Sequence, residues 1–294
     1  MKKVFGLLII GLVILMASCS NNNEDSTATL MLNINGLEDL GSNYVYEGWI
    51  IVNNSPVSTG TFTSTAANQS FSVDATQLKN ATKFVLTIEP AGETGTAADT
   101  PSDTKFLSGD FSGDSASLSV GIVGDFNNSD TGSFFLRSPT DETDSNNGND
   151  ENGIWFGTPG TPPSPSLSLP VLGTGWKYEG WVVVDGVGPV STGTFTAFDT
   201  ADDNAGTAAS FGGTENSGPP IPGEDFLNNA PAGFTFPLDI RGRTVVISVE
   251  PSPDNSPAPF TLKPLIGTAG NDTAPTTYTL NFSDSSFPTG TANR

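Results

Sequence analysis

The sequence contains no histidine and only one cysteine among its 294 residues. The missing histidine excludes Ser-His-Asp and Cys-His catalysis and histidine-ligated zinc or iron, and a single cysteine excludes an internal disulfide. Basic residues are also few, since 11 lysines and arginines stand against 32 aspartates and glutamates, for a formal net charge of −21. Nucleic acid and anionic lipid surfaces are therefore disfavoured as partners, because both require clustered lysine and arginine.

Glycine, proline and aromatic residues are abundant instead. The 33 glycines and 22 prolines interrupt helices and favour turns, while 19 Phe, 4 Trp and 4 Tyr supply apolar mass for a core. Only 15% of the residues are charged, which is too few for long helices with ion-paired surfaces. The composition therefore predicts an all-β protein.

The first residues have the pattern of a signal peptide that ends at the cysteine. Lys2 and Lys3 precede an apolar run over 4–16, which is shorter than the roughly 20 residues that a spanning helix needs. The run ends in Leu-Met-Ala-Ser before Cys19, which resembles a bacterial lipobox. We expect residues 1–18 to be removed and Cys19 to be diacylated, with palmitate-type chains that hold the protein in a membrane. The alternative is an ordinary cleavable signal with a coincidental cysteine.

Residues 19–27 form the expected lipidated tether. Their polar, acidic composition lacks apolar anchors, so they are predicted to be flexible. The stretch also resembles the polar, acidic segment that directs Bacteroidetes-type lipoproteins to the cell surface. We therefore expect an outer-membrane lipoprotein that faces either the cell surface or the periplasm.

Three sequence blocks occur twice in the same order, which indicates a duplicated module. They are YEGWIIV at 46–52 and YEGWVVV at 178–184, PVSTGTFT at 56–63 and again at 189–196, and FVLTIEP at 84–90 and VVISVEP at 245–251. The spacing favours two domains over a solenoid, which requires three or more short repeats.

Each copy has the alternation and the turn residues of short strands. This pattern predicts two related immunoglobulin-like β-sandwich modules, over 28–137 and 166–294. An acidic linker over 138–165 is expected to contain part of a hairpin, because Ser-Phe-Phe-Leu at 133–136 and Ile-Trp-Phe at 154–156 have the pattern of paired strands. The proline-rich stretch 212–242 has interleaved phenylalanines, so it is expected to be a packed, ordered cover.

The repeated blocks resemble the C-terminal extracytoplasmic domain of anti-sigma-K factors. In that family a tryptophan strand leads through a turn to a Pro-Val-x-x-Gly-x-Phe hairpin, and a later strand closes in Thr-x-Glu-Pro. Both copies match over about half of their length. The resemblance implies an envelope-exposed binding or sensing domain. A lipidated Cys19 stands where the family has a sigma-binding domain and a transmembrane helix, so we expect no sigma-factor sequestration by this chain.

The repeated glutamates Glu47 and Glu179 are the strongest candidates for buried acidic groups. As a pair they could serve glycoside chemistry, which needs two carboxyl groups roughly 5 to 9.5 Å apart. Since each module has one at the same place, we expect a structural role, with Lys105 and Lys263 as partners, because an unpaired buried charge costs several kcal/mol. Glu89 and Glu250, which precede prolines at strand ends, are interpreted in the same way.

Two kinds of ligand site are considered. Acidic loops could supply the oxygen ligands of calcium, although neither candidate loop has EF-hand spacing and a solvated loop is the alternative; the residues are Asp199, Asp202, Asp203 and Asn204, or Asp141, Asp144, Asn146 and Asp150. Trp155 and Trp176 are the candidate ligand-binding residues, as exposed platforms for sugars. Membership of the core is the alternative for both.

These observations predict a non-enzymatic, lipid-anchored envelope protein that binds or senses an unidentified protein or glycan. No cofactor and no catalytic or metal-binding residue is assigned. The alternative function is that of a surface glycan-binding accessory lipoprotein, which exposed coplanar aromatic rings would favour. A carboxylate-based hydrolase is a third hypothesis, which two facing carboxylates in an open cleft would favour.

Overall fold

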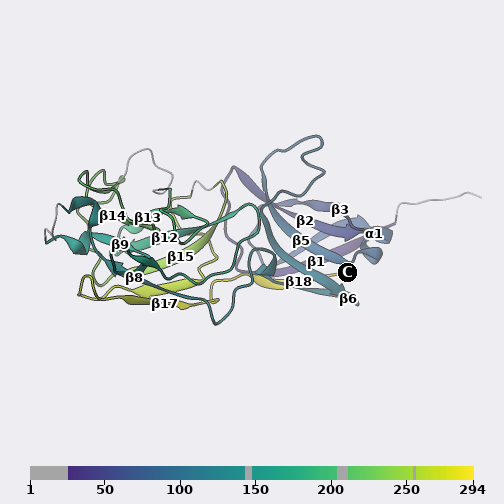
Figure 1. Cartoon of the computed structure of the whole chain (residues 1–294). Coiled ribbons are helices and arrows are strands. Elements are labelled where there is room, and N and C mark those ends of the chain that lie inside the picture. The colour runs from purple at the N-terminus through teal and green to yellow at the C-terminus, as the bar shows by residue number, and fades with distance from the viewer. Residues whose placement is uncertain (1–25, 143–147, 204–210, 254–255) are drawn as a thin grey trace, which may run out of the picture.

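Two eight-stranded antiparallel sheets lie end to end in the computed structural model, which describes residues 26–142, 148–203, 211–253 and 256–294 (Figure 1). In spatial order, the first sheet consists of β3 (Ser55–Phe62), β2 (Tyr44–Val52), β5 (Lys83–Pro90), β6 (Lys105–Ser112), β7 (Ser115–Leu118), β18 (Thr289–Asn293), β1 (Thr27–Asn35) and β4 (Asn68–Asp74). The second consists of β13 (Gly188–Phe195), β12 (Trp176–Val184), β15 (Thr244–Pro251), β16 (Leu265–Thr268), β17 (Tyr278–Phe282), β8 (Thr131–Leu136), β9 (Gly153–Trp155) and β14 (Gly223–Asp225). We call these sheets with their loops the first and second modules.

The remaining elements are short. They are the helix α1 (Ala75–Asn80), the 3₁₀ turns at Val120–Ile122, Pro139–Asp141 and Asp150–Asn152, and a two-stranded ribbon of β10 (Gly157–Thr158) and β11 (Ser164–Pro165). The helix α1 begins at Asp74, whose carboxylate accepts a hydrogen bond from the Gln77 N–H at 2.7 Å, as an N-cap does. In each module the sheet curves so that its two edge strands contact each other. These are β3 and β4 in the first module and β13 and β14 in the second. The predicted all-β architecture of two related modules is confirmed.

The repeated blocks form equivalent hairpins at one edge of each sheet. In the first module, β2 and β3 are joined by Asn53 and Asn54, whose positive φ values of 51° and 62° fit a two-residue primed turn. Strand β2 pairs with β3 on one side and β5 on the other, and its middle residues are buried. Strand β12 is its counterpart between β13 and β15.

Strand pairing crosses the predicted boundary between the modules at two places. Strand β8 lies within the predicted first module, yet it pairs with β17 and β9 of the second sheet. The C-terminal strand β18 lies within the predicted second module, yet it pairs with β7 and β1 of the first sheet. Both occupy the sixth position in their sheets, so each sheet is completed by a strand from the far side of the predicted boundary. The pairing of β8 with β9 confirms the expected linker hairpin.

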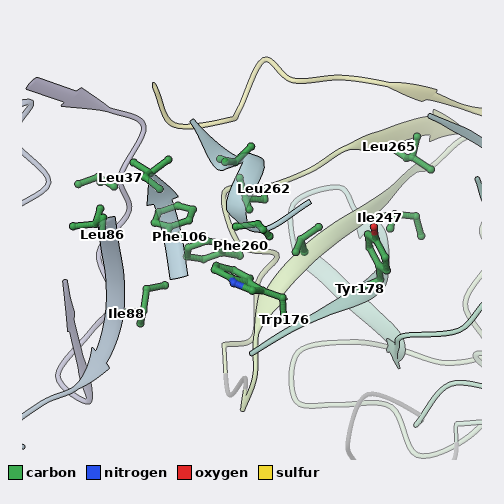
Figure 2. Packing of buried hydrophobic residues seen from close by; sticks show 14 of the residues in the cluster. Leu37, Leu86, Ile88, Phe106, Trp176, Tyr178, Ile247, Phe260, Leu262 and Leu265 are labelled. Atoms are coloured by element: carbon green, nitrogen blue, oxygen red, sulfur yellow. The ribbon is translucent and has the colours of Figure 1, made fainter. Parts of the chain in front are cut away.

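A single hydrophobic cluster extends through both modules and across the contact between them (Figure 2). At this contact the Phe106 ring lies 5.7 Å from Trp176 and 5.2 Å from Phe260, centroid to centroid, and Trp176 and Phe260 are 5.8 Å apart. Aromatic pairs at such distances each contribute about 0.5–1.5 kcal/mol beyond the area that they bury. The two modules therefore share a packed interface.

Candidate functional site

The second module contains a cleft of about 550 Å³ over the hairpin of β12 and β13. Its floor comes from these two strands and from the end of β15. The described residues of its walls are Asp203, Phe211, Pro231, Ala232, Phe234, Ser252, Pro253, Ser256 and Pro257. We call this space the β12–β13 cleft.

Most of the cleft floor belongs to the duplicated blocks. Its floor residues Glu179, Trp181, Pro189, Val190, Ser191, Thr194, Glu250 and Pro251 have counterparts in the first module at Glu47, Trp49, Pro56, Val57, Ser58, Thr61, Glu89 and Pro90. The walls have another origin, because they derive largely from residues 196–243, a segment much longer than residues 63–82 at the same place in the first module. A repeated framework is therefore enclosed by a segment specific to the second module.

A chain of hydrogen bonds fixes the tryptophan under the cleft floor. The Trp181 indole N–H donates to Ser248 Oγ at 2.7 Å, and the Ser248 hydroxyl donates to Glu250. Glu250 in turn accepts the Phe260 N–H, at 2.9 Å to Oε1 and 3.1 Å to Oε2. Buried polar groups that are satisfied in this way hold their neighbours in one arrangement.

The first module repeats this chain with different residues. Trp49 donates to Thr87 Oγ1 at 2.9 Å, Thr87 donates to Glu89, and Glu89 accepts the Ser102 N–H at 2.9 Å. In both copies the strand-end glutamate therefore holds the loop that follows it. The structural role expected for Glu89 and Glu250 is present, with backbone N–H groups and hydroxyls as partners in place of lysine.

The expected ion pairs of the repeated glutamates are not formed among the described residues. Glu47 accepts a hydrogen bond from the Ser58 hydroxyl, while the Lys105 ammonium donates to the Ser102 carbonyl at 3.1 Å. Glu179 likewise accepts from Ser191, and no ion pair joins it to Lys263. A short serine on the neighbouring strand reaches these carboxylates directly, so no long lysine side chain is needed to satisfy them. Burial is the largest effect on Glu47 and raises the pKa of its carboxyl group.

Lys177, the one basic residue among the described residues of the cleft, also connects the inserted segment to the sheet. Lys177 Nζ lies 3.2 Å from Asp203 Oδ2, and Asp203 also accepts the Thr194 N–H at 2.7 Å and the Thr194 hydroxyl at 2.5 Å. Burial favours the protonated form of Asp203, but the hydrogen bonds from Thr194 and Lys177 outweigh it and lower its pKa. The first module has Val45 at the place of Lys177, so this ion pair is specific to the second module.

A cluster of phenylalanines supports the wall of the cleft. Phe211 packs edge-on against Phe236 with ring centroids 5.4 Å apart, and Phe226 lies 6.0 Å from Phe211 and 5.4 Å from Phe236. Phe211 and Phe234 then face the cleft. The stretch 212–242 is therefore a packed, ordered cover, as its interleaved phenylalanines predicted.

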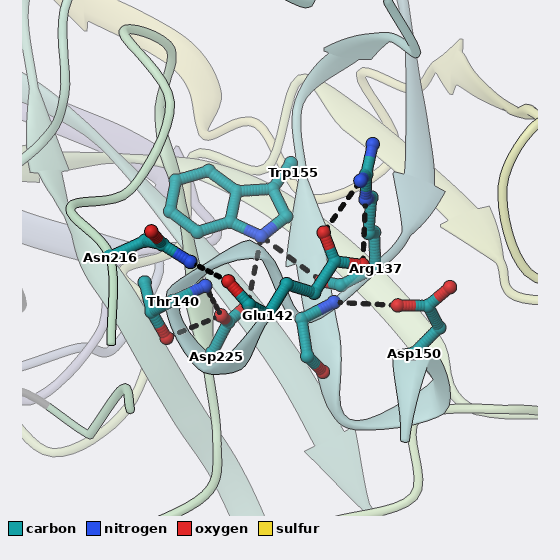
Figure 3. A network of polar contacts seen from close by, with 8 residues as sticks. Arg137, Thr140, Glu142, Asp150, Trp155, Asn216 and Asp225 are labelled. Carbon is teal, nitrogen blue, oxygen red and sulfur yellow. Dashed lines mark hydrogen bonds and ion pairs between the residues drawn. The ribbon is translucent and has the colours of Figure 1, made fainter. Parts of the chain in front are cut away.

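Trp155 lies in a buried polar network beside the second sheet (Figure 3). Its indole N–H donates to Asp225 Oδ1 at 2.9 Å and to the Arg137 carbonyl at 3.2 Å. Asp225 Oδ2 accepts the N–H and the hydroxyl of Thr140 at 2.8 and 2.6 Å. Burial raises the Asp225 pKa to about 6 although these hydrogen bonds lower it. An ion pair between Arg137 and Glu142 covers the network.

Neither predicted ligand-binding tryptophan presents its ring to solvent. Trp155 is 3% exposed, and Trp176 is 4% exposed. The Trp176 indole N–H donates to the Lys105 carbonyl at 3.1 Å across the contact between the modules. A sugar platform requires an accessible ring face, so the geometry supports the alternative that both tryptophans belong to the core.

Several residues of the proposed lipid and calcium sites lie outside the described residues. They are Cys19 and, in the candidate calcium loops, Asp144, Asn146 and Asn204. Within the described part of the chain, no group of three or more acidic or cysteine side chains is placed to hold a metal ion, and no helix is long and apolar enough to cross a membrane. Of the calcium candidates, Asp202 accepts the Gly223 N–H at 2.8 Å and Asp141 accepts from Asn149 at 2.7 Å.

Comparison with known families identifies one segment of the chain. Residues 18–104 match the family model of the anti-sigma-K factor rskA, C-terminal. No curated protein and no solved structure is detectably similar to the chain. The RskA C-terminal match spans β1 to β5 and includes Glu47, Trp49 and Glu89, so the first module carries an anti-sigma-factor-like domain.

The β12–β13 cleft lies outside the RskA C-terminal match, and analysis of the sequence did not identify it. Two features of the sequence could nevertheless have indicated this region. One was the length of the segment between the second and third repeated blocks in the second copy. The other was Lys177, a charged residue at a position where the first copy has an aliphatic one. The enclosure itself depends on how the inserted segment packs, which the repeat does not specify.

Proposed function

We propose that this chain is a non-enzymatic cell-envelope lipoprotein that binds or senses a ligand in the β12–β13 cleft, on a second copy of the anti-sigma-factor-like domain. The observation that carries the proposal is that the floor and the walls of the cleft have different origins in the sequence. Residues duplicated in both modules form the floor, and residues present only in the second module form the walls and the Lys177–Asp203 ion pair. An insertion that encloses a repeated framework is typical of a domain adapted to hold a ligand.

The cleft offers apolar walls and a few fixed polar groups. Prolines and the rings of Phe211 and Phe234 line its sides, while Glu179, Lys177 and Asp203 supply charge. This combination suits a ligand that has an apolar body and one hydrogen-bonding or charged end.

The arrangement of the acidic residues supports binding over hydrolysis. Glu179 and Glu250 both line the cleft, as a carboxylate-based hydrolase requires. Both oxygens of Glu250 accept the Phe260 N–H, and Glu179 accepts the Ser191 hydroxyl. Carboxylates committed to holding a loop and a strand are poorly placed to act as acid and nucleophile. The glycan-binding alternative is weakened by the burial of Trp155 and Trp176.

The fold suits attachment through Cys19. The start of β1 lies beside α1, because Ser26 accepts the Ala75 N–H at 2.8 Å. This is the end of the first module that lies away from the second module (Figure 1). A lipid on Cys19 would therefore hold the first module near the membrane and leave the β12–β13 cleft on the outer module.

Three experiments test the proposal. Labelling of cells with a palmitate analogue should tag the wild type but not Cys19→Ala. Protease treatment of intact cells should release the modules if the protein faces outward. A panel of short peptides and neutral oligosaccharides is then screened by thermal shift. A ligand of the cleft should stabilise the wild type and Glu47→Gln but not Glu179→Gln, which is the same change in the other copy. Equal loss in both variants, or no stabilisation by any probe, would count against the cleft.

A further inference from the structure

A second cavity, separate from the β12–β13 cleft, lies between the two modules. This intermodule groove has a volume of about 600 Å³ and is lined by residues 38–44 and 102–104 of the first module and by residues 250–253, Ser256 and Phe260 of the second. Residues 250–253 and Ser256 also border the β12–β13 cleft, so the two cavities lie on either side of one wall.

The groove is held open by contacts that fix the two modules against each other. Phe260 lines the groove, and its ring packs against the rings of Phe106 and Trp176 at the contact between the modules (Figure 2). Gly175 approaches the Asp103 backbone so closely that a Cβ atom there would lie 2.8 Å from it, and its φ of +85° also favours glycine. The groove is therefore preformed, which lowers the cost of ordering it around a ligand.

The charge of the groove has one sign. Of the described residues, four acidic ones line it, Glu38, Asp39, Asp103 and Glu250, and no lysine or arginine does. Asp39 and Asp103 are exposed and belong to loops of the same module. Apolar surface in the lining comes from Leu40, Tyr44, Ile88 and Phe260. Such a lining repels anionic ligands and attracts cationic ones.

The distribution of the carboxylates points to an organic cation. A metal ion needs several oxygens converging within 2.0–2.6 Å, and no group of three acidic side chains in the described part of the chain converges in this way. The groove carboxylates are spread along two loops beside apolar side chains. We infer that the intermodule groove binds an extended basic peptide segment, whose lysines or arginines face the loop carboxylates while its apolar atoms contact the walls.

Fluorescence anisotropy with the full chain tests this inference. The probe is a fluorescein-labelled octapeptide of alternating Lys and Ala, compared with Glu/Ala and Gln/Ala peptides of the same length. Because exposed ion pairs contribute about 0.2–1 kcal/mol each, the loss of two pairs in Asp39→Asn/Asp103→Asn should weaken Lys/Ala binding by about twofold to thirtyfold. The matched control Asp114→Asn/Asp185→Asn makes the same change in net charge at exposed turns away from the groove and should change binding less than twofold. Added salt should weaken binding to the wild type.

Each other outcome overturns the inference. Equal weakening in both double variants would indicate nonspecific attraction, and equal binding of the Glu/Ala or Gln/Ala peptide would remove the charge argument. Calcium and spermine are tested as competitors of the peptide. If Asp39→Asn/Asp103→Asn abolished their competition but left peptide binding unchanged, the groove would have a different occupant. Loss of binding in Glu179→Gln alone would place the peptide in the β12–β13 cleft, which leaves the proposed function standing. Absence of binding to a wild type of normal thermal stability would refute the groove as a peptide site.

Discussion

Glu224 on β14 provides the sharpest test of the energetics of this fold. Its side chain is 2% exposed, and its carboxylate accepts the Asp225 N–H at 2.9 Å. Burial, helped by the nearby carboxylates of Asp202 and Asp225, raises the pKa of Glu224 to about 8 against the lowering effect of the hydrogen bond from Asp225. The folded protein therefore holds a protonated glutamic acid at neutral pH.

The consequence is a loss of stability as the pH rises. Below the unfolded pKa of 4.5 the carboxyl group is protonated in both states and has no effect. Between 4.5 and about 8 the unfolded chain is ionised while the folded chain is not, so the free energy of unfolding falls with pH. At 1.36 kcal/mol per pH unit, the loss between pH 5 and pH 8 reaches up to ~4 kcal/mol.

Replacement of Glu224 by Gln should remove this dependence. The amide keeps the acceptor oxygen but cannot ionise, so Glu224→Gln should gain up to ~4 kcal/mol over the wild type between pH 5 and pH 8. Urea unfolding followed by tryptophan fluorescence at several pH values measures the difference. The exposed Asp185→Asn, which removes one carboxylate from a turn, should keep the wild-type slope. A Glu224→Gln profile parallel to that of the wild type would refute the argument.

Three further substitutions test other parts of the fold. Arg294→Ala removes hydrogen bonds to three carbonyls around the end of α1 and to one in the β6–β7 turn, so it should lower stability by about 2–3 kcal/mol in urea unfolding. Gly180→Ala places a Cβ atom 2.5 Å from a buried ring and should cost about 1–3 kcal/mol, whereas Gly121→Ala, with no atom closer than 3.6 Å, should stay within about 0.5 kcal/mol of the wild type in the same assay. Trp155→Phe removes one hydrogen-bond donor to Asp225, so it should raise the pKa of that carboxyl group and lower the free energy of unfolding by about 1–3 kcal/mol. In the same assay, stability should then fall more steeply as the pH rises through 6.

Local features of the fold were predictable because each depends on neighbouring residues. The Asn53–Asn54 turn follows from the tolerance of asparagine for positive φ, and the burial of β2 follows from apolar residues on both of its faces. Aromatic residues at both ends of the acidic linker likewise predicted the pairing of β8 with β9. In each case the pairing partner lies within a short stretch of chain, or the repeat supplies a second copy of the pattern.

The position of β18 was not predictable in this way. Its sequence, Thr-Gly-Thr-Ala-Asn over 289–293, has one alanine that is buried and no run of large apolar residues. Its partner β1 lies at the other end of the chain, so no local pattern links the two strands. The pairing depends on an open position between β7 and β1 in the first sheet, which only the assembled sheet reveals.

In the candidate site, too, features set by neighbouring residues were predictable, and features that depend on strand register and packing were not. The repeated glutamates were identified, but their serine partners on the adjacent strand were not, because the partner depends on strand register. Residue type alone left two alternatives open for Trp155 and Trp176, an exposed sugar platform or membership of the core, and only the packing decides between them. The inserted segment 196–243 was visible as extra length, whereas the cleft arises from its contacts with Lys177 and the sheet.

The exchange of β8 and β18 explains why the two modules can present a fixed groove. The chain crosses from the first sheet to the second between β7 and β8, and it returns between β17 and β18. A second module joined by one linker could rotate about it, but two crossings beside a packed aromatic contact restrict that motion. The return also brings Arg294 to α1, next to the start of β1. The first and last described strands, β1 and β18, are therefore neighbours in the first sheet. Under the proposed attachment at Cys19, a pull on the anchor would load β1 within the sheet that β18 completes.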